Sequence, residues 1–173
     1  MDSPIHIKGE LTTSVLRKIG MEIEQRLGQS PEKITLEIDS QGGSAKGSQT
    51  IFERFIKNEE RIICRILEAN SAAALLALLG NRRSISQGGS FGIHLGSISV
   101  ESNELLEQGK ASDRSVKRIL AFRAFYLAVL KQRTRLPEEA YAKLHASNRL
   151  VLNPDECLKY GIVQEISTDT IAA

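Results

Sequence analysis

Ser71 is a single hydroxyl residue at the head of a run, residues 72–79, that contains only alanine and leucine. These are the two best helix formers, and a helix without a polar stripe is expected to be buried on all sides. The segment before Ser71, residues 61–67, has the pattern of a strand. A serine at such a strand-to-helix junction is either a helix N-cap or a nucleophile placed where unpaired N–H groups favour negative charge.

A hydroxyl nucleophile needs a base for its proton and backbone donors for the oxyanion. Gly42-Gly43 follows a second strand-like segment, and a Gly-Gly turn leaves its N–H groups uncovered. His94 ends a later strand-like segment. The alternatives are a tight turn or a phosphate-binding loop for the glycines, and a buried or capping histidine for His94. No P-loop lysine follows the glycines, which makes phosphate the weaker option.

Strands and helices alternate along the chain, which predicts an α/β fold of parallel βαβ units with right-handed crossovers. In such sheets, sites form at the carboxyl ends of the strands, where all three features above fall. The expected strands are residues 5–11, 34–39, 62–67, 83–86, 90–94 and 162–166, with turns at 40–44 and 88–90. The expected helices are residues 13–27, 45–57, 72–79, 137–144 and 154–161.

Residues 102–134 read as one long helix, with Gly109 as an interruption near its start. A helix of this length is too long for a small sheet, so we expect part of it to project. Its aromatic side chains then suggest a partner surface, for instance for another copy of the chain. An ordinary core helix is the alternative.

The composition is that of one soluble domain covering residues 1–173, with 41% hydrophobic and 25% charged residues. The net charge of +2 and the absence of a basic run argue against nucleic acid or a membrane surface as a partner. No signal peptide is evident, and Cys64 and Cys157 lie in apolar patterns without zinc-site spacing. We therefore expect buried free thiols, a cytoplasmic protein, and neither metal nor cofactor.

Four segments together resemble the proteolytic subunit of the Clp protease family. The segment "ITLEIDSQGGSAKG" resembles its strand and Gly-Gly turn, and "ANSAAALLALLG" its nucleophile helix. "FGIHLG" is similar to its histidine segment, and "NPDECLKYGIVQEI" to its closing helix and strand. The resemblance covers nearly the whole chain in the same order, and it implies a ClpP/crotonase-like fold with a projecting handle helix.

The resemblance implies a role for each of these residues. Ser71 would be the nucleophile and His94 the general base, while Gly42 or Gly43 together with Ala72 would donate N–H groups to the oxyanion. Residues 41–45 would pair with an extended peptide substrate. The long helix would join two rings of seven subunits into a chamber that admits unfolded polypeptides.

The sequence departs from the family pattern where the family has its third catalytic residue, an aspartate. That position falls on Arg149, with Asn148 next to it, and the nearest acid, Asp155, has the pattern of a helix first-turn residue. The positive charge of Arg149 beside the site would disfavour a protonated histidine. An asparagine can orient a histidine but cannot stabilise an imidazolium by charge. In addition, Ala72 replaces the usual methionine, and the amino-terminal loops that engage a ring ATPase look truncated or absent, which leaves an ATPase partner uncertain.

These observations predict a serine endopeptidase of the Clp type that acts through Ser71 and His94, with Asn148 as a weak third member. The alternative is a catalytically inactive Clp-like subunit with a structural or binding role, which the loss of the acid favours. Acyl-CoA chemistry on the related crotonase fold is a third, less favoured hypothesis, because that chemistry usually needs carboxylates near the site and a longer chain.

Overall fold

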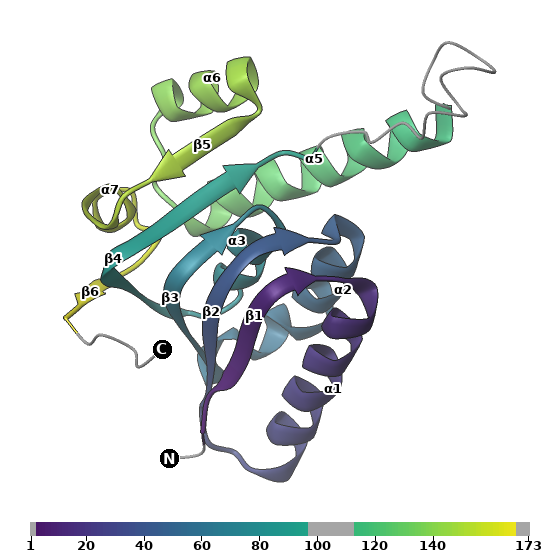
Figure 1. The fold of residues 1–173 in the computed structure, drawn as a ribbon, viewed down its shortest axis with the longest axis vertical. Helices are drawn as coiled ribbons and strands as arrows, with labels where there is room; N and C mark the ends of the chain where they lie inside the picture. Colours follow the sequence, from purple (N-terminus) through teal and green to yellow (C-terminus); the bar gives the residue numbers. More distant parts are fainter. Residues whose placement is uncertain (1–2, 97–112, 169–173) are drawn as a thin grey trace.

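The computed structural model describes residues 3–96 and 113–168, in which strands and helices alternate as the sequence predicts (Figure 1). The strands are β1 Ile5–Leu11, β2 Ile34–Gly43, β3 Ile62–Asn70, β4 Arg82–His94, β5 Arg149–Leu152 and β6 Glu165–Ser167. The helices are α1 Thr13–Gln29, α2 Ala45–Phe55, the 3-10 helix Ile56–Arg61, α3 Ala72–Ala77, α5 Asp113–Arg133, α6 Glu138–Ser147 and α7 Pro154–Lys159.

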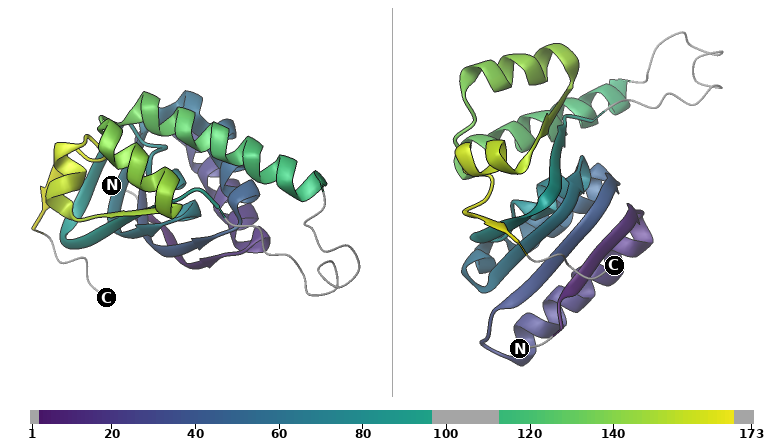
Figure 2. Two further views of the ribbon diagram at one scale, coloured as in Figure 1. Left: turned by 90° about the horizontal axis from the view of Figure 1, so that it is seen from above. Right: turned by 60° about the vertical axis from the view of Figure 1, so that its left-hand side comes forward.

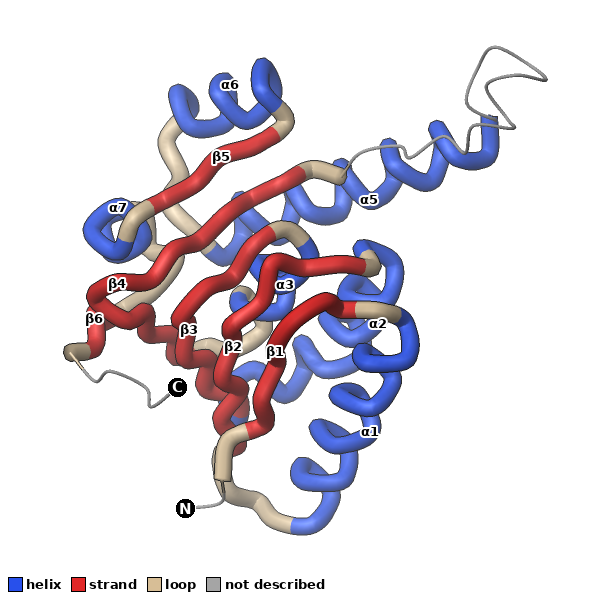
Figure 3. The backbone as a smooth tube through the Cα atoms, in the orientation of Figure 1, coloured by secondary structure: helices blue, strands red, loops and turns tan. Residues whose placement is uncertain are grey.

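The strands form one sheet in the order β1-β2-β3-β4-β5, with β6 paired to β4 (Figure 3). Neighbouring strands from β1 to β4 are parallel, as is the pair β4–β6, whereas β5 runs antiparallel to β4. Helices α1, α2 and α3 lie on one side of the parallel strands (Figure 2). The prediction of an α/β fold is therefore confirmed, and the carboxyl ends of β2, β3 and β4 meet at one edge.

Helix α3 is the centre of the core. All six of its residues are buried, as expected for an alanine and leucine helix without a polar stripe. It is shorter than predicted, because the chain leaves α-helical geometry after Ala77, although Leu78 and Leu79 are still fully buried. Both cysteines are free and buried, as predicted.

Two of the predicted turns are wrong, and one strand is missing from the sequence-based prediction. Strand β2 continues through Gly42 and Gly43, where we expected a turn, because both pair with the end of β1. Strand β4 runs through residues 88–90, which therefore do not separate two strands. Between the paired segments β4 has more residues than β3, and a register shift opposite Ile66–Glu68 accommodates them. Strand β5 was not expected at all.

Helix α5 carries the chain past the edge of the sheet (Figure 1). From Val116 onward, the first buried side chain of this helix is Phe122, while Leu120 is 54% exposed. Farther along, Phe125 contacts Phe52 of α2 edge-on, with ring centroids 5.8 Å apart. Residues 102–112 of the predicted long helix, including Gly109, lie outside the described residues. None of the described helices combines the length and apolarity needed to cross a membrane.

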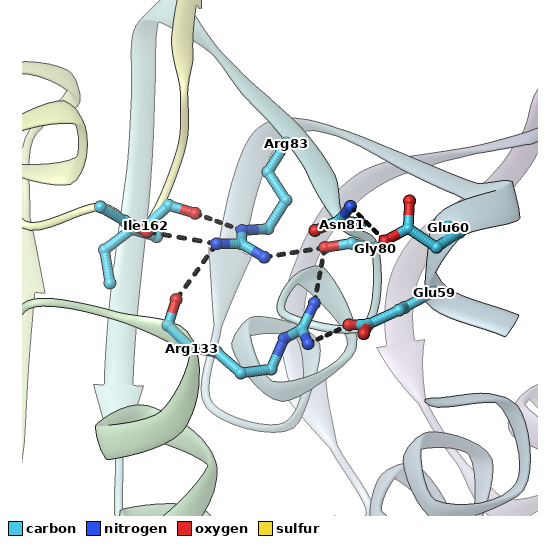
Figure 4. Close-up of polar contacts among 8 residues, drawn as sticks. Glu59, Glu60, Gly80, Asn81, Arg83, Arg133 and Ile162 are labelled. Atoms are coloured by element: carbon cyan, nitrogen blue, oxygen red, sulfur yellow. Dashed lines mark hydrogen bonds and ion pairs between the residues drawn. The ribbon is translucent and has the colours of Figure 1, made fainter. Parts of the chain in front are cut away.

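A buried arginine fastens β4 to the carboxyl-terminal part of the chain (Figure 4). Arg83 is 4% exposed and donates to the carbonyls of Ile162, Gly80 and Arg133 at 2.5, 2.8 and 3.1 Å. Burial, followed by the charge of Arg133, lowers the Arg83 pKa to about 10. Arg133 itself pairs with Glu59. These contacts fix the start of β4, the strand that ends at His94.

Candidate active site

Ser71 occupies a strained backbone position between β3 and α3. Its φ and ψ are 53° and −118°, a conformation that is costly for a residue with a side chain and that clusters at functional sites. Its N–H donates to the carbonyl of Gly92 at 2.7 Å, which continues the pairing of β3 with β4. The hydroxyl makes no capping hydrogen bond to α3. The geometry therefore does not support the N-cap interpretation.

Gly42 brings the end of β2 against Ser71. It has φ +98°, and a Cβ there would lie 2.5 Å from the carbonyl oxygen of Asn70 and 2.9 Å from the nitrogen of Ala72. Only glycine permits this approach. Gly43 instead lies against the backbone of Leu11. Of the three oxyanion-hole candidates, the structure thus places Gly42 and Ala72 side by side at Ser71.

The amides of Gly42 and Ala72 are not equally available as donors. The Gly42 N–H donates to the hydroxyl of Ser40 at 3.1 Å, and that hydroxyl donates to the carbonyl of Gly9. The Ala72 N–H is the first of α3 and has no acceptor within the helix. An oxyanion would bind to Ala72 directly but would have to replace Ser40 at Gly42.

His94 and Ser71 line the same pocket. His94 ends β4, next to the strand that delivers Ser71. The pocket has a volume of about 300 Å³, and its lining residues are Gln41, Asn70, Ser71, Gly92, Ile93, His94 and Arg149. The predicted nucleophile and base are therefore brought together, from sequence positions more than twenty residues apart.

Asn148 contacts the imidazole directly. It is the last residue before β5 and adopts the left-handed conformation, with φ 59°, which asparagine tolerates better than most side chains. Its Nδ2 lies 3.2 Å from Nε2 of His94. Of the two positions considered for the third member, Asn148 contacts the histidine ring, while Arg149 lines the pocket.

Arg123 of α5 is a site residue that the sequence did not reveal. Its Nε donates to the carbonyl of Leu95 at 3.1 Å, and its Nη2 donates to the carbonyl of Gly96 at 3.1 Å and to Oδ1 of Asn148 at 3.3 Å. The only sequence feature that could have identified Arg123 is its positive charge next to Phe122, a member of the apolar stripe of this helix.

Burial lowers the pKa of His94, and the positive charges of Arg149 and Arg123 lower it further. We expected such an effect from Arg149, and its direction is confirmed. Because the ordinary histidine pKa is about 6.5, lowering it favours the neutral imidazole at pH 7. It is thus in the protonation state of a base, but the imidazolium it would form is disfavoured.

Asn70 is a second polar residue that sequence reasoning missed. It is 9% exposed, and its Nδ2 donates to Oε1 of Gln41 at 3.2 Å and to Oε1 of Glu68 at 2.9 Å. A Cβ on Gly92 would lie 1.8 Å from its Oδ1, so Gly92 makes room for this side chain. Asn70 thereby holds Gln41 at the pocket. The sequence feature that could have identified Asn70 is a single amide side chain directly before Ser71.

The model of the Clp protease family matches residues 3–170. The chain belongs to the Clp protease family. A solved structure of a ClpP1 mutant from Listeria monocytogenes is similar to it, with a TM-score of 0.76 and 18% sequence identity. That match covers 96% of this chain and 92% of the Listeria chain. No curated protein sequence matches the chain.

As a member of the Clp protease family, the chain has the ClpP fold that the sequence segments predicted. Ser71 lies at the start of α3, His94 at the end of β4, and Gly42 at the end of β2. In an α/β sheet this edge is where ligands bind. The arrangement is chemically suited to attack by a hydroxyl on a carbonyl carbon, with a neutral imidazole and a free amide close by.

Proposed function

We propose that this chain is a serine endopeptidase of the Clp type, with Ser71 as nucleophile, His94 as general base and Asn148 as the third member. The observation that carries the proposal is the strained backbone of Ser71 in a pocket shared with His94. Strain of this kind is retained where it presents a side chain for chemistry rather than for packing. Family membership supports the same reaction class.

The proposed reaction has two halves. His94 takes the proton of the Ser71 hydroxyl as Oγ bonds to the carbonyl carbon, and the carbonyl electron pair moves to the oxygen, which the Ala72 N–H stabilises. The C–N bond then breaks, and the imidazolium gives its proton to the leaving amine. Water repeats these steps on the acyl-enzyme, which releases a carboxylic acid and restores the Ser71 hydroxyl.

The substrate of this proposal is an extended polypeptide that pairs with residues 41–45 as an added strand. Gln41 already lines the pocket, at the end of β2. The resemblance further implies a single-domain subunit in paired heptameric rings, which would restrict access to unfolded chains. A cytoplasmic location and the absence of a cofactor remain expectations from the sequence, which leaves an ATPase partner uncertain.

A non-catalytic Clp-like subunit is the second candidate, and one observation favours it. The imidazole Nε2 lies against the amide nitrogen of Asn148. In a Ser-His-Asp site a carboxylate oxygen instead accepts from Nδ1–H, and Nε2 faces the serine. Loss of that carboxylate costs on the order of 10⁴ in rate in a serine protease. A subunit that only completes a ring would tolerate such a loss.

Labelling with a fluorophosphonate probe tests the peptidase proposal. We expect the assembled protein to react at Ser71, and Ser71→Ala to lose labelling completely, because the phosphonate bonds to the activated Oγ. His94→Ala should lower the labelling rate, because it removes the proposed general base. Ser14→Ala, which changes an exposed serine of α1, is the matched control and should label normally. A folded protein that does not label supports the non-catalytic subunit instead.

A further inference from the structure

The amide of Asn148 can adopt only one orientation among its neighbours. Arg123 can only donate hydrogen bonds, so the amide atom that faces it at 3.3 Å must be the oxygen. The carbonyl of Gly96 can only accept, so the amide atom 2.9 Å from it must be the nitrogen. Turning the amide over would set nitrogen against the guanidinium and oxygen against the Gly96 carbonyl oxygen. Both partners therefore select the same orientation.

This orientation determines where the proton of His94 resides. The second N–H of Asn148 points to Nε2 of His94 at 3.2 Å, so that Nε2 must accept. A neutral imidazole that accepts at Nε2 carries its proton on Nδ1. In this arrangement neither ring nitrogen is available to the Ser71 hydroxyl, because one lone pair is occupied and the other nitrogen is protonated.

The imidazolium is incompatible with the same contacts. It would carry a proton on Nε2, facing an N–H of Asn148, while Arg149 and Arg123 add positive charge. A catalytic histidine has to pass through this cation, and an orienting residue helps only if it accepts from the ring. The third member can thus assist His94 only after its amide has turned over.

We propose that Arg123 is a positioning residue that keeps the Asn148 amide in its donating orientation and so holds His94 as the Nδ1–H tautomer with its Nε2 lone pair engaged by Asn148, which makes the ring a poor base toward Ser71. This inference concerns regulation of the site and rests on the proposed peptidase function. It makes Arg123 an inhibitory contact while residue 148 is asparagine. With a carboxylate at 148 the same guanidinium would be an ion-pair partner that holds the acceptor in place.

The tautomer of the unmodified protein is the most direct test, and it requires no activity. Solid-state ¹⁵N NMR of the assembled, histidine-labelled protein should show His94 protonated at Nδ1 and unprotonated at Nε2 at neutral pH, with the assignment made by loss of the signal in His94→Gln. Arg123→Met should convert at least part of the signal to the Nε2–H form. Arg118→Met, at an exposed arginine of the same helix, should not. An Nε2–H ring in the unmodified protein overturns the proposal.

The rate of fluorophosphonate labelling supplies a second test, in which the effect of Arg123 should change sign. Arg123→Met alone should raise the rate by about 10-fold, because a base becomes available. Asn148→Asp should raise it at least as much, and adding Arg123→Met to that variant should lower the rate or leave it unchanged. A merely structural arginine would lower the rate in both backgrounds, which would refute the proposal. If no variant labels, the peptidase proposal fails and the NMR result alone decides this one.

Discussion

Two positive charges face His94, and they set the chemistry of this site at the scale of single residues. Arg149 and Arg123 add to burial in lowering the His94 pKa. A serine protease triad instead places a carboxylate beside the ring, which stabilises the imidazolium that forms during catalysis. The present arrangement stabilises the neutral ring, so any catalysis pays an electrostatic cost at the step in which Ser71 loses its proton.

The lowered pKa of His94 predicts a pH dependence of stability. Below about pH 6.5 the unfolded chain binds a proton at this residue, whereas the folded protein does not until its lower pKa is reached. The free energy of unfolding should therefore fall as the pH falls through this window, and it should level off below the folded pKa. Urea denaturation across the window should show a smaller fall for His94→Gln than for the unmodified protein.

His145→Gln is the control, because His145 is an exposed residue of α6. It measures how the loss of any histidine changes the dependence of the free energy of unfolding on pH. If the free energy of unfolding changes with pH by equal slopes in the unmodified protein and in His94→Gln, the prediction is contradicted.

The lowered pKa of His94 also predicts how labelling of Ser71 depends on pH. The labelling rate should be retained at pH values where an ordinary histidine is already protonated, since only the neutral ring can act as base.

At the scale of elements, the approach of β2 to the start of α3 depends on one glycine. A Cβ at Gly42 would meet backbone atoms of Asn70 and Ala72, at a φ of +98°. Gly42→Ala should therefore destabilise the protein by about 3 kcal/mol or more and abolish labelling of Ser71. Thermal or urea unfolding, together with the probe, measures both effects.

Gly28 provides the matched control for this substitution. It lies in α1, is exposed, and has open space where a Cβ would stand. Gly28→Ala should stabilise the protein by about 0.5 to 1 kcal/mol, because alanine loses less backbone entropy in a helix. A similar cost at both positions would show that Gly42 is not fixed by its contacts with Asn70 and Ala72.

The order of the elements could be predicted from the sequence because hydrophobic periodicity is a local property. The junction at Ser71 was found in this way, as was the end of β4 that carries His94, whereas Gly42 was assigned to a turn after β2. Residues 88–90 were misread as a turn, since their glycines reflect the register shift between β4 and β3 rather than a chain reversal. Strand β5 is only four residues long and largely exposed, so it has no clear period.

The contacts around the histidine could not be read from the sequence. The sequence distinguishes Asn148 only through the family resemblance, which marks its position. Arg123 reaches the site from a helix 29 residues after His94, and nothing in the local pattern of α5 distinguishes it from a solvated arginine. The orientation of an amide depends on all of its partners at once, which only a three-dimensional arrangement supplies.

At the scale of the whole molecule, α5 has two parts with different surroundings. From Phe122 onward it buries apolar side chains against the domain, and its end is tied to β4 because Arg83 donates to the carbonyl of Arg133. Its earlier part extends past the sheet and exposes Leu120. An exposed leucine on a helix that extends past the sheet is in a position to contact a second subunit. We propose that this part of α5 is the handle that contacts another subunit.

This proposal predicts the effect of a charge at Leu120. Leu120→Glu should shift the assembly to smaller species in native mass spectrometry, because a buried carboxylate without a partner opposes association. Leu158→Glu introduces the same charge at a leucine of α7 that is 40% exposed, and it should leave the mass of the assembly unchanged. Circular dichroism checks that both variants are folded. An intact assembly for Leu120→Glu would place the contact between subunits elsewhere, and dissociation of both variants would indicate that added charge, rather than α5, governs assembly.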